Sequence, residues 1–349
     1  ACGDCMAVKR LRFHTRKTGG VEVEQLLSAD QRGLVGHSGN LDDRVRIEIV
    51  TVIVSPAVEI GEAGQAKLLA SRVLVIGAGG LGSPLLLYLA AAGVGTIGIV
   101  DDDVVDLSNL QRQVVHDTSA IGQAKTMSAQ ARLAEVNPEV RVVAHTARLV
   151  PATALDVVRG YDLVADGSDN FATRYLLNDA CYLAGKTLVS AAIMRFDGQL
   201  TTFKAHTRGR DEPQAHPCYR CVFGDQPPDP KESCADVGVL GALAGTLGAL
   251  QATEVIKEIV GIGDTLSGSL VLYDALAADF RKIKLKADPA CPLCGPQATI
   301  RDLASVGYGD VTPVTPVGRA VAGVVMLLGI AMFAVPAGIL ATGFAAELR

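Results

Sequence analysis

Short apolar, β-branched runs alternate with longer helical stretches between residues 60 and 205. The runs predict strands at residues 73–76, 96–100, 140–144, 162–165 and 187–193. The stretches between them predict helices at residues 84–92, 123–136, 153–159 and 173–183. Continuous apolar strands separated by helices are typical of a parallel sheet that is covered on both faces. The pattern therefore predicts a doubly wound, mostly parallel α/β domain.

The chain beyond this region predicts further strands and another helix. Further apolar runs predict strands at residues 198–203, 270–273 and 280–285. Residues 235–260 predict a buried helix, because small and apolar residues occupy all of its sides. Residues 206–233 are rich in Pro, Asp, Arg and Gly, which is typical of a long mobile crossover.

Composition narrows the class of protein. A net charge of −5 and a pI near 5.7 leave no dominant basic face, so nucleic acid is not expected as the main partner. No apolar run follows the basic residues near the N-terminus, so no secretory signal is predicted. Four of the eight cysteines form two CxxC pairs far apart in the sequence, which indicates metal binding in a reducing compartment. We therefore expect a cytoplasmic protein.

Residues 77–82 read GAGGLG and directly follow the first predicted strand. Gly77, Gly79 and Gly82 match the spacing of a dinucleotide fingerprint, and Asp101 ends the next strand where a ribose-binding acid is expected. The glycines permit a tight turn, and a helix N-terminus favours negatively charged phosphate. Taken alone, this motif fits an NAD-dependent dehydrogenase as well as an ATP-dependent enzyme.

Cations after the glycine loop favour a nucleotide whose phosphates react. Arg112 lies just beyond Asn109, and Lys125 opens the next predicted helix, so both could neutralise a triphosphate. Asp169 and Asn170 follow another strand and suit Mg²⁺ binding. The alternatives are that Arg112 is a surface ion-pair partner and that Asp169 caps the helix beginning near residue 173. Residues 102 and 103 are expected to be turn residues.

Two CxxC half-sites predict a zinc site built from Cys218, Cys221, Cys291 and Cys294. Four thiolates form a closed tetrahedral site, which is structural because no position is left for water. Such a site would tie the crossover to the end of the domain. Cys234 lies alone just before the predicted buried helix, where a thiol has a lowered pKa. Its alternative role is that of a small residue at a helix start.

Four sequence strings carry a specific resemblance to a known family. They read GAGGLGS, DDDVVDLSNLQRQ, IGQAK and ADGSDNFATRYLLNDAC. Residues 59–303 resemble the MoeB/ThiF/HesA adenylyltransferases, which are related to ubiquitin-activating enzymes. We therefore divide the chain into an N-terminal segment (1–58), an ATP-binding adenylyltransferase domain (59–303) and a tail (304–349).

The resemblance implies the cofactors and the roles of single residues. Cofactors would be ATP, Mg²⁺ and Zn²⁺. Residues expected to bind ATP and Mg²⁺ are Gly77, Gly79, Gly80, Gly82, Asp101, Asn109, Arg112, Lys125, Asp169 and Asn170. Residues expected to act in catalysis are Arg112, Lys125, Asp169 and Cys234, since cysteines equivalent to Cys234 in some relatives form an acyl-persulfide or thioester. The family also uses an upstream arginine, for which Arg44 or Arg46 could serve despite altered spacing.

The resemblance also implies a reaction and its partners. The family adenylates the C-terminal glycine carboxylate of a ubiquitin-like β-grasp sulfur carrier, for thiocarboxylate formation in molybdopterin or thiamin biosynthesis. A homodimer is expected, with a separate rhodanese or cysteine desulfurase as sulfur donor. The alternative within enzymes is adenylation of a small-molecule or tRNA-linked carboxylate.

The tail differs from the rest of the chain. Residues 305–310 read SVGYGD and resemble a potassium-channel selectivity filter, and the apolar run to residue 344 resembles the pore exit and inner helix. This uncharged run is long enough to span a bilayer, so a C-terminal hydrophobic helix with membrane contact is expected. The outer helix and most of the pore helix are missing, so a working pore is not expected. A membrane-tethered potassium-channel fragment is the alternative reading of the function.

Overall fold

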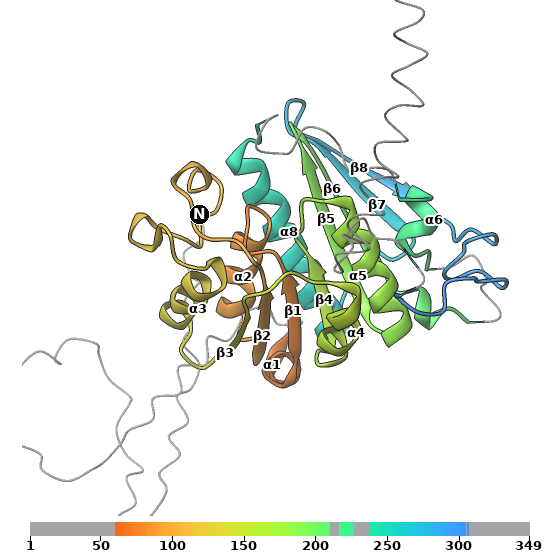
Figure 1. The fold of residues 1–349 in the computed structure, drawn as a ribbon, viewed down its shortest axis with the longest axis horizontal. Coiled ribbons are helices and arrows are strands. Elements are labelled where there is room, and N and C mark those ends of the chain that lie inside the picture. Colours follow the sequence, from red (N-terminus) through yellow and green to blue (C-terminus); the bar gives the residue numbers. More distant parts are fainter. Residues whose placement is uncertain (1–59, 210–215, 227–237, 305, 307–349) are drawn as a thin grey trace, which may run out of the picture.

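The computed structural model describes residues 60–209, 216–226, 238–304 and 306. Its centre is a sheet of eight strands in the order β3-β2-β1-β4-β5-β6-β7-β8 (Figure 1). The strands are β1 Arg72–Ile76, β2 Thr96–Val100, β3 Arg141–His145, β4 Leu163–Asp166, β5 Thr187–Met194, β6 Asp197–Phe203, β7 Ser269–Asp274 and β8 Asp279–Lys284. The first five pair in parallel, and β6, β7 and β8 extend the sheet by antiparallel pairing.

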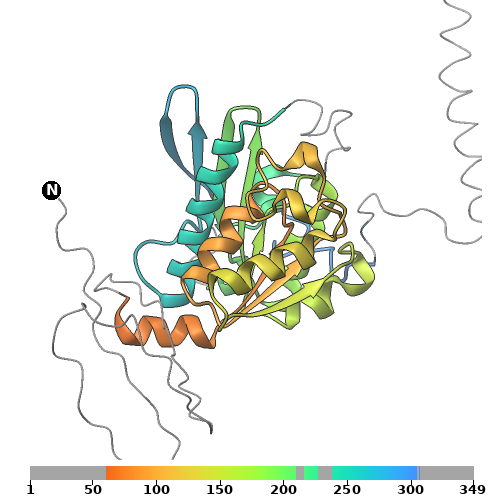
Figure 2. The same ribbon diagram turned by 90° about the vertical axis from the view of Figure 1, so that its left-hand side faces the viewer.

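Helices cover both faces of this sheet. They are α1 Gly61–Ala70, α2 Gly82–Ala91, α3 Lys125–Val136, α4 Pro151–Arg159, α5 Phe171–Ala184, α6 Tyr219–Phe223 and α8 Gly241–Val260. Apolar side chains of α2, α3 and α8 form one buried cluster, and those of α4 and α5 form another on the opposite face. Helix α8 packs against α1 and α2 (Figures 1 and 2).

The α/β prediction is confirmed, and every predicted strand beyond residue 72 is present with ends displaced by at most one residue. Helix α1 was missed. The predicted crossover contains the 3₁₀ turn Ala205–Thr207 and helix α6. The helix predicted from residue 235 begins at Gly241, because Gly238 has a φ of +79° and Leu240 is extended. The predicted C-terminal helix lies outside the described residues, and no helix within them is long and apolar enough to cross a membrane.

The strand order creates a crevice between β1 and β4. The chain runs outward from β1 to β2 and β3 and then returns to place β4 on the other side of β1. Ile76 pairs with Asp166, so both strands end together and the loops that follow them are neighbours. Ligands of open α/β sheets bind at such a switch point.

A close backbone contact fixes the loop after β1. Gly77 has a φ of +89°, which glycine adopts without strain. A Cβ on Gly82 would lie 1.9 Å from the carbonyl oxygen of Gly77. Only glycine at position 82 therefore lets α2 begin directly against the end of β1.

Replacing Gly82 with alanine is expected to force the backbone apart and destabilise the protein by about 1–3 kcal/mol. The matched control is Gly245→Ala on α8, where an added Cβ meets no described atom within 4 Å. That control removes a helix-interior glycine and is expected to stabilise by up to about 1 kcal/mol. Urea unfolding of both variants measures the difference, and equal effects would contradict the steric argument.

Candidate functional site

A cavity of about 600 Å³ opens at the switch point. The loops after β1, β2 and β4 line it, together with the segment before α3. The predicted ligand-binding residues that line this cavity are Gly77, Gly79, Gly80, Asp101, Asn109, Arg112, Lys125, Asp169 and Asn170. Gly82 lies behind them at the first turn of α2. The structure thus brings together residues that span almost a hundred positions of sequence.

Asp101 joins two of the lining loops. One carboxylate oxygen accepts the backbone N–H of Ala78 at 2.8 Å, and the other accepts that of Asp103 at 2.9 Å. Burial raises the pKa of Asp101, while the hydrogen bond from Ala78 opposes that shift. The carboxylate therefore fixes the glycine loop against the end of β2, and part of it still faces the cavity.

Lys125 is the first residue of α3 and is only 5% exposed. Its Nζ donates to Asp103 at 2.8 Å, so Asp103 is an ion-pair partner as well as a turn residue. Sequence reasoning missed this pair because the two residues lie on different elements. The pair holds the ammonium group at the cavity wall.

Arg112 approaches the cavity from the segment that follows the 3₁₀ turn Leu107–Asn109. Its Nη2 donates to the side-chain oxygen of Asn109 at 2.8 Å, and its methylenes pack over Gly80. Within the described parts of the chain, no carboxylate lies at ion-pair distance from it. The surface ion-pair alternative is therefore not supported.

The loop after β4 is ordered by a buried carboxylate. Asp166 accepts hydrogen bonds from the backbone and hydroxyl of Ser168, at 2.9 and 2.6 Å, and from Ser190 at 3.0 Å. The buried Arg174 donates to the carbonyl of Ser168 at 2.6 Å. These contacts present the next residue, the exposed Asp169, at the cavity.

Asn170, not Asp169, caps α5. Its side-chain oxygen accepts the backbone N–H of Thr173 at 2.8 Å. The alternative that Asp169 is the helix cap is therefore wrong, and the Asp169 carboxylate keeps capacity for a cation. Asn170 still lines the cavity beside it.

Sequence reasoning missed several buried polar residues of this site. Gln113 and Arg174 line the cavity, and His116 lies behind the glycine loop. In the sequence, these residues stand out only by lying near Arg112 or Asp169. That nearness does not show which way their side chains point. Contacts between separate elements decide their roles.

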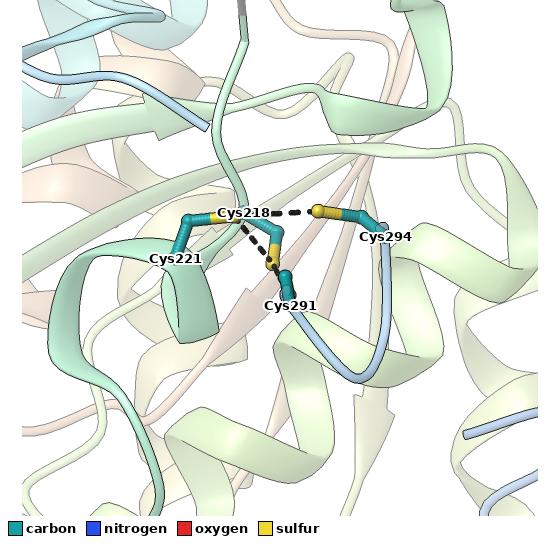
Figure 3. Close-up of side chains that lie close together, drawn as sticks. All are labelled: Cys218, Cys221, Cys291 and Cys294. Carbon is teal, nitrogen blue, oxygen red and sulfur yellow. Dashed lines mark hydrogen bonds between the residues drawn. The ribbon is translucent and has the colours of Figure 1, made fainter. Parts of the chain in front are cut away.

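The four predicted metal ligands gather in one cluster, with all four side chains pointing inward (Figure 3). The Sγ–Sγ distances are 3.7 Å for Cys218–Cys221, 3.5 Å for Cys218–Cys291 and 3.3 Å for Cys221–Cys294. Four thiolates about 2.3 Å from one Zn²⁺ would lie about 3.8 Å apart, so the cluster fits that ion closely. None of these cysteines forms a disulfide.

A buried ion pair anchors the first half of this cluster. Arg220, between Cys218 and Cys221, forms a bidentate pair with Asp179 of α5, including a 2.6 Å contact from Nη2. Both side chains are almost completely buried, at 5% and 0% exposure. Asn178 also accepts the backbone N–H of Tyr219 at 2.8 Å. Helix α5 therefore holds the half-site in place.

Three predicted functional residues lie outside the described residues. They are Cys234 and the two candidate upstream arginines, Arg44 and Arg46. Their roles stay predictions.

The switch-point cavity, its glycine loop and its cations define a nucleotide-binding α/β protein. A family model described as the ThiF family matches residues 55–293. The chain therefore belongs to the ThiF family. A second model, described as an ion channel, matches residues 299–345, most of which lie outside the described residues.

Curated relatives agree with this assignment. Adenylyltransferase and sulfurtransferase MOCS3 of Bos taurus is 55% identical over 247 residues, covering 70% of this chain and 52% of the relative. The chain thus spans about half the length of that protein. The sulfur carrier protein adenylyltransferase of Thermus thermophilus is 49% identical over 246 residues, covering 70% of this chain and 90% of the relative.

A solved structure shares the fold at low sequence identity. The crystal structure of E. coli MccB with ATP has a TM-score of 0.57 and 22% identity, covering 66% of this chain and 69% of that chain. At this identity the likeness shows the fold alone.

Replacing Asp179 with asparagine is expected to lower the free energy of unfolding by about 3–5 kcal/mol, because it removes the carboxylate that pairs with the buried Arg220 charge. The matched control is Asp156→Asn, which removes an exposed pair with Arg159 at 3.5 Å. Such exposed pairs contribute at most about 1 kcal/mol. Chemical denaturation measures the free energy of unfolding of both variants. Similar small losses of that free energy would show that the buried pair does not anchor α6.

Proposed function

We propose that this chain is an ATP-dependent adenylyltransferase. Its substrate would be the C-terminal glycine carboxylate of a ubiquitin-like sulfur-carrier protein, which it activates for thiocarboxylate formation in molybdopterin or thiamin biosynthesis. The observation that carries the proposal is the convergence of Arg112 and Lys125 on one cavity beside a glycine loop. The names of the curated relatives support the same reaction.

The proposed chemistry needs positioning and charge neutralisation more than an acid or base. A carboxylate oxygen attacks the α-phosphorus of ATP, the bond to the β-phosphate bridging oxygen breaks, and pyrophosphate leaves. Arg112 and Lys125 would spread the negative charge that builds up on the phosphates. The N-terminus of α2 would hold phosphate, and Asp101 would bind the ribose.

Mg²⁺ would be held by Asp169 together with phosphate oxygens. Magnesium takes oxygen ligands and commonly uses one or two carboxylates plus substrate phosphates. Asp169 fits, because it is exposed at the cavity and, among the residues that the structure describes, its carboxylate has only a 3.4 Å contact with the Asn170 amide. The ion would shield phosphate charge.

The antiparallel edge of the sheet offers a docking face for the carrier. Ile193 lines the cavity, and the next residue, Met194, is exposed. The carbonyl of Phe196 accepts the backbone N–H of Ala275 at 2.9 Å, which brings the β5–β6 turn to the β7–β8 turn. The exposed apolar residues at and beside these turns are Met194, Phe196, Leu276 and Phe280. A carrier bound there could extend its C-terminal tail into the cavity.

Further features of the proposal concern residues outside the described ranges. Cys234 would attack the acyl-adenylate, forming a thioester and releasing AMP. A separate rhodanese or cysteine desulfurase would then supply sulfur. The protein would be a cytoplasmic homodimer. Arg44 or Arg46 would supply the upstream arginine of the nucleotide site, in its own subunit or in the partner.

ATP–pyrophosphate exchange with a panel of carriers that end in Gly-Gly tests the proposal. Exchange is expected only when a carrier is present. Arg112→Ala is expected to lower the rate at least about 10²-fold, because one charge-stabilising group is lost. Phe280→Asp is expected to raise the carrier KM while leaving the ATP KM unchanged.

Cys234→Ala serves as the control. Because Cys234 would act only after adenylation, this variant is expected to catalyse ATP–pyrophosphate exchange at the wild-type rate. Binding of ATP without exchange for any carrier would contradict the proposed reaction. No ATP binding at all would contradict the nucleotide site itself.

We also propose that the cysteine cluster holds a structural Zn²⁺. A closed site of four thiolates leaves no open position for water, so the ion would stabilise the fold and take no part in the reaction. The site would join α6 to the segment after β8.

Purified protein is expected to contain about one zinc ion per chain, and Cys294→Ser to contain much less. Chelation is expected to lower the melting temperature, since bound metal contributes to folding free energy. Elemental analysis and thermal melts measure both effects. Cys181→Ala, a buried cysteine of α5 outside the cluster, is the control and should keep its zinc.

A further inference from the structure

We propose that His116 is a positioning residue that locks the glycine loop to the two segments carrying Arg112 and Lys125. This inference rests on the nucleotide site of the proposed function. His116 does not line the cavity itself, so it would act through the groups that do.

Two hydrogen bonds define the state of the buried imidazole. His116 Nε2 lies 2.9 Å from the carbonyl oxygen of Ala78, and Nδ1 lies 2.9 Å from the hydroxyl of Ser128. Both side chains are buried, at 7% and 6% exposure. A carbonyl can only accept, so Nε2 carries the proton and Nδ1 accepts from the hydroxyl. Burial lowers the pKa of His116, in agreement with this neutral tautomer.

The imidazole completes a clamp on the backbone of one residue, Ala78. Asp101 accepts the N–H of Ala78 at 2.8 Å, and His116 donates to the carbonyl of the same residue at 2.9 Å. Ala78 lies between Gly77 and Gly79, where the backbone has unusual freedom. Each of the two peptide units that meet at the Ala78 Cα therefore has one polar group held, and neither can rotate without breaking a hydrogen bond. The orientation of the neighbouring backbone amides at the cavity is thereby fixed.

The same residue reaches the two cation-bearing segments. Its backbone N–H donates to Gln113 at 3.0 Å, and Gln113 in turn donates to Asn109 at 3.0 Å, closing the turn that carries Arg112. Ser128 lies in the first turn of α3, three residues after Lys125. His116 is therefore the point where glycine loop, arginine segment and lysine helix meet.

Another histidine provides a matched comparison. His145 at the end of β3 bonds through Nε2 to the hydroxyl of Tyr161 at 2.8 Å, and neither residue lines the cavity. Removing either imidazole breaks a buried or half-buried hydrogen bond. Of these two imidazoles, only that of His116 bonds to the glycine loop, while His145 contacts Asp101 through its backbone carbonyl, which a substitution of the side chain retains.

The test measures the Kd of mant-ATP and the melting temperature of His116→Leu, His116→Gln and His145→Leu. His116→Leu is expected to weaken binding about tenfold, as for the loss of a buried hydrogen bond. His116→Gln retains a donor and an acceptor and is expected to stay within about threefold of the wild type. His145→Leu is expected to bind normally even if it melts lower.

Wild-type affinity in His116→Leu, or no rescue in His116→Gln, would overturn the inference. If His116→Leu does not fold, Ser128→Ala decides, since it removes only the hydroxyl partner and is expected to weaken binding about threefold. A threefold loss supports the inference and an unchanged Kd overturns it. These experiments measure nucleotide binding without a carrier. Their results can therefore be interpreted even if carrier-dependent exchange is not observed.

Discussion

The site depends first on the close approach of Gly82 to the carbonyl of Gly77. At 1.9 Å from that oxygen, no Cβ can be accommodated, so α2 starts directly at the end of β1. This position sets the distance from the glycine loop to Asp101, whose carboxylate spans from Ala78 to Asp103. A longer turn would move the helix N-terminus away from the loops of β2 and β4. This backbone contact therefore places the N-terminus of α2 at the glycine loop that lines the cavity.

Buried polar contacts then join this parallel half of the sheet to its antiparallel half. Gln251 of α8 donates to the carbonyls of Asp166, at the end of β4, and Val189, within β5. Three residues later, Glu254 accepts from Thr202 of β6 at 2.8 Å and from the backbone of Leu266 at 2.7 Å. Such groups are costly to bury alone and stabilising when paired, so they fix α8 in a single register. Because Gln251 bonds to the carbonyl of Asp166, the loop that follows β4 and carries Asp169 is held in place as well.

The sequence predicted what depends on local patterning. Strand β2 could be placed to the residue because an apolar run lies between polar residues, and Lys125 could be placed at a helix start. The cysteine spacing predicted the cluster, because ligand type and spacing are themselves local.

What the sequence could not predict depends on pairing between distant elements. The Asp179–Arg220 pair joins residues 41 positions apart, and no pattern near either residue selects the other. His116 reaches 38 positions back to Ala78 for the same reason. For the N-cap of α5, the sequence offers two neighbouring candidates. Asp169 and Asn170 are both good helix caps, and only the backbone direction selects between them. Helix α1 was missed because its GEAGQAKLLA sequence has almost no apolar stripe.

The two cations of the site are held differently, and the difference suits the proposed reaction. Lys125 is nearly buried, but its partner Asp103 is 68% exposed, so the carboxylate can turn toward solvent and would leave the ammonium to pair with phosphate. Arg112 is held by the neutral Asn109 amide, which orients the guanidinium without neutralising it. Its full charge therefore remains for the phosphates, and its planar fork suits two phosphate oxygens at once. In the proposed reaction, Lys125 would therefore be a charge that changes partner, and Arg112 would be one already oriented toward the phosphates.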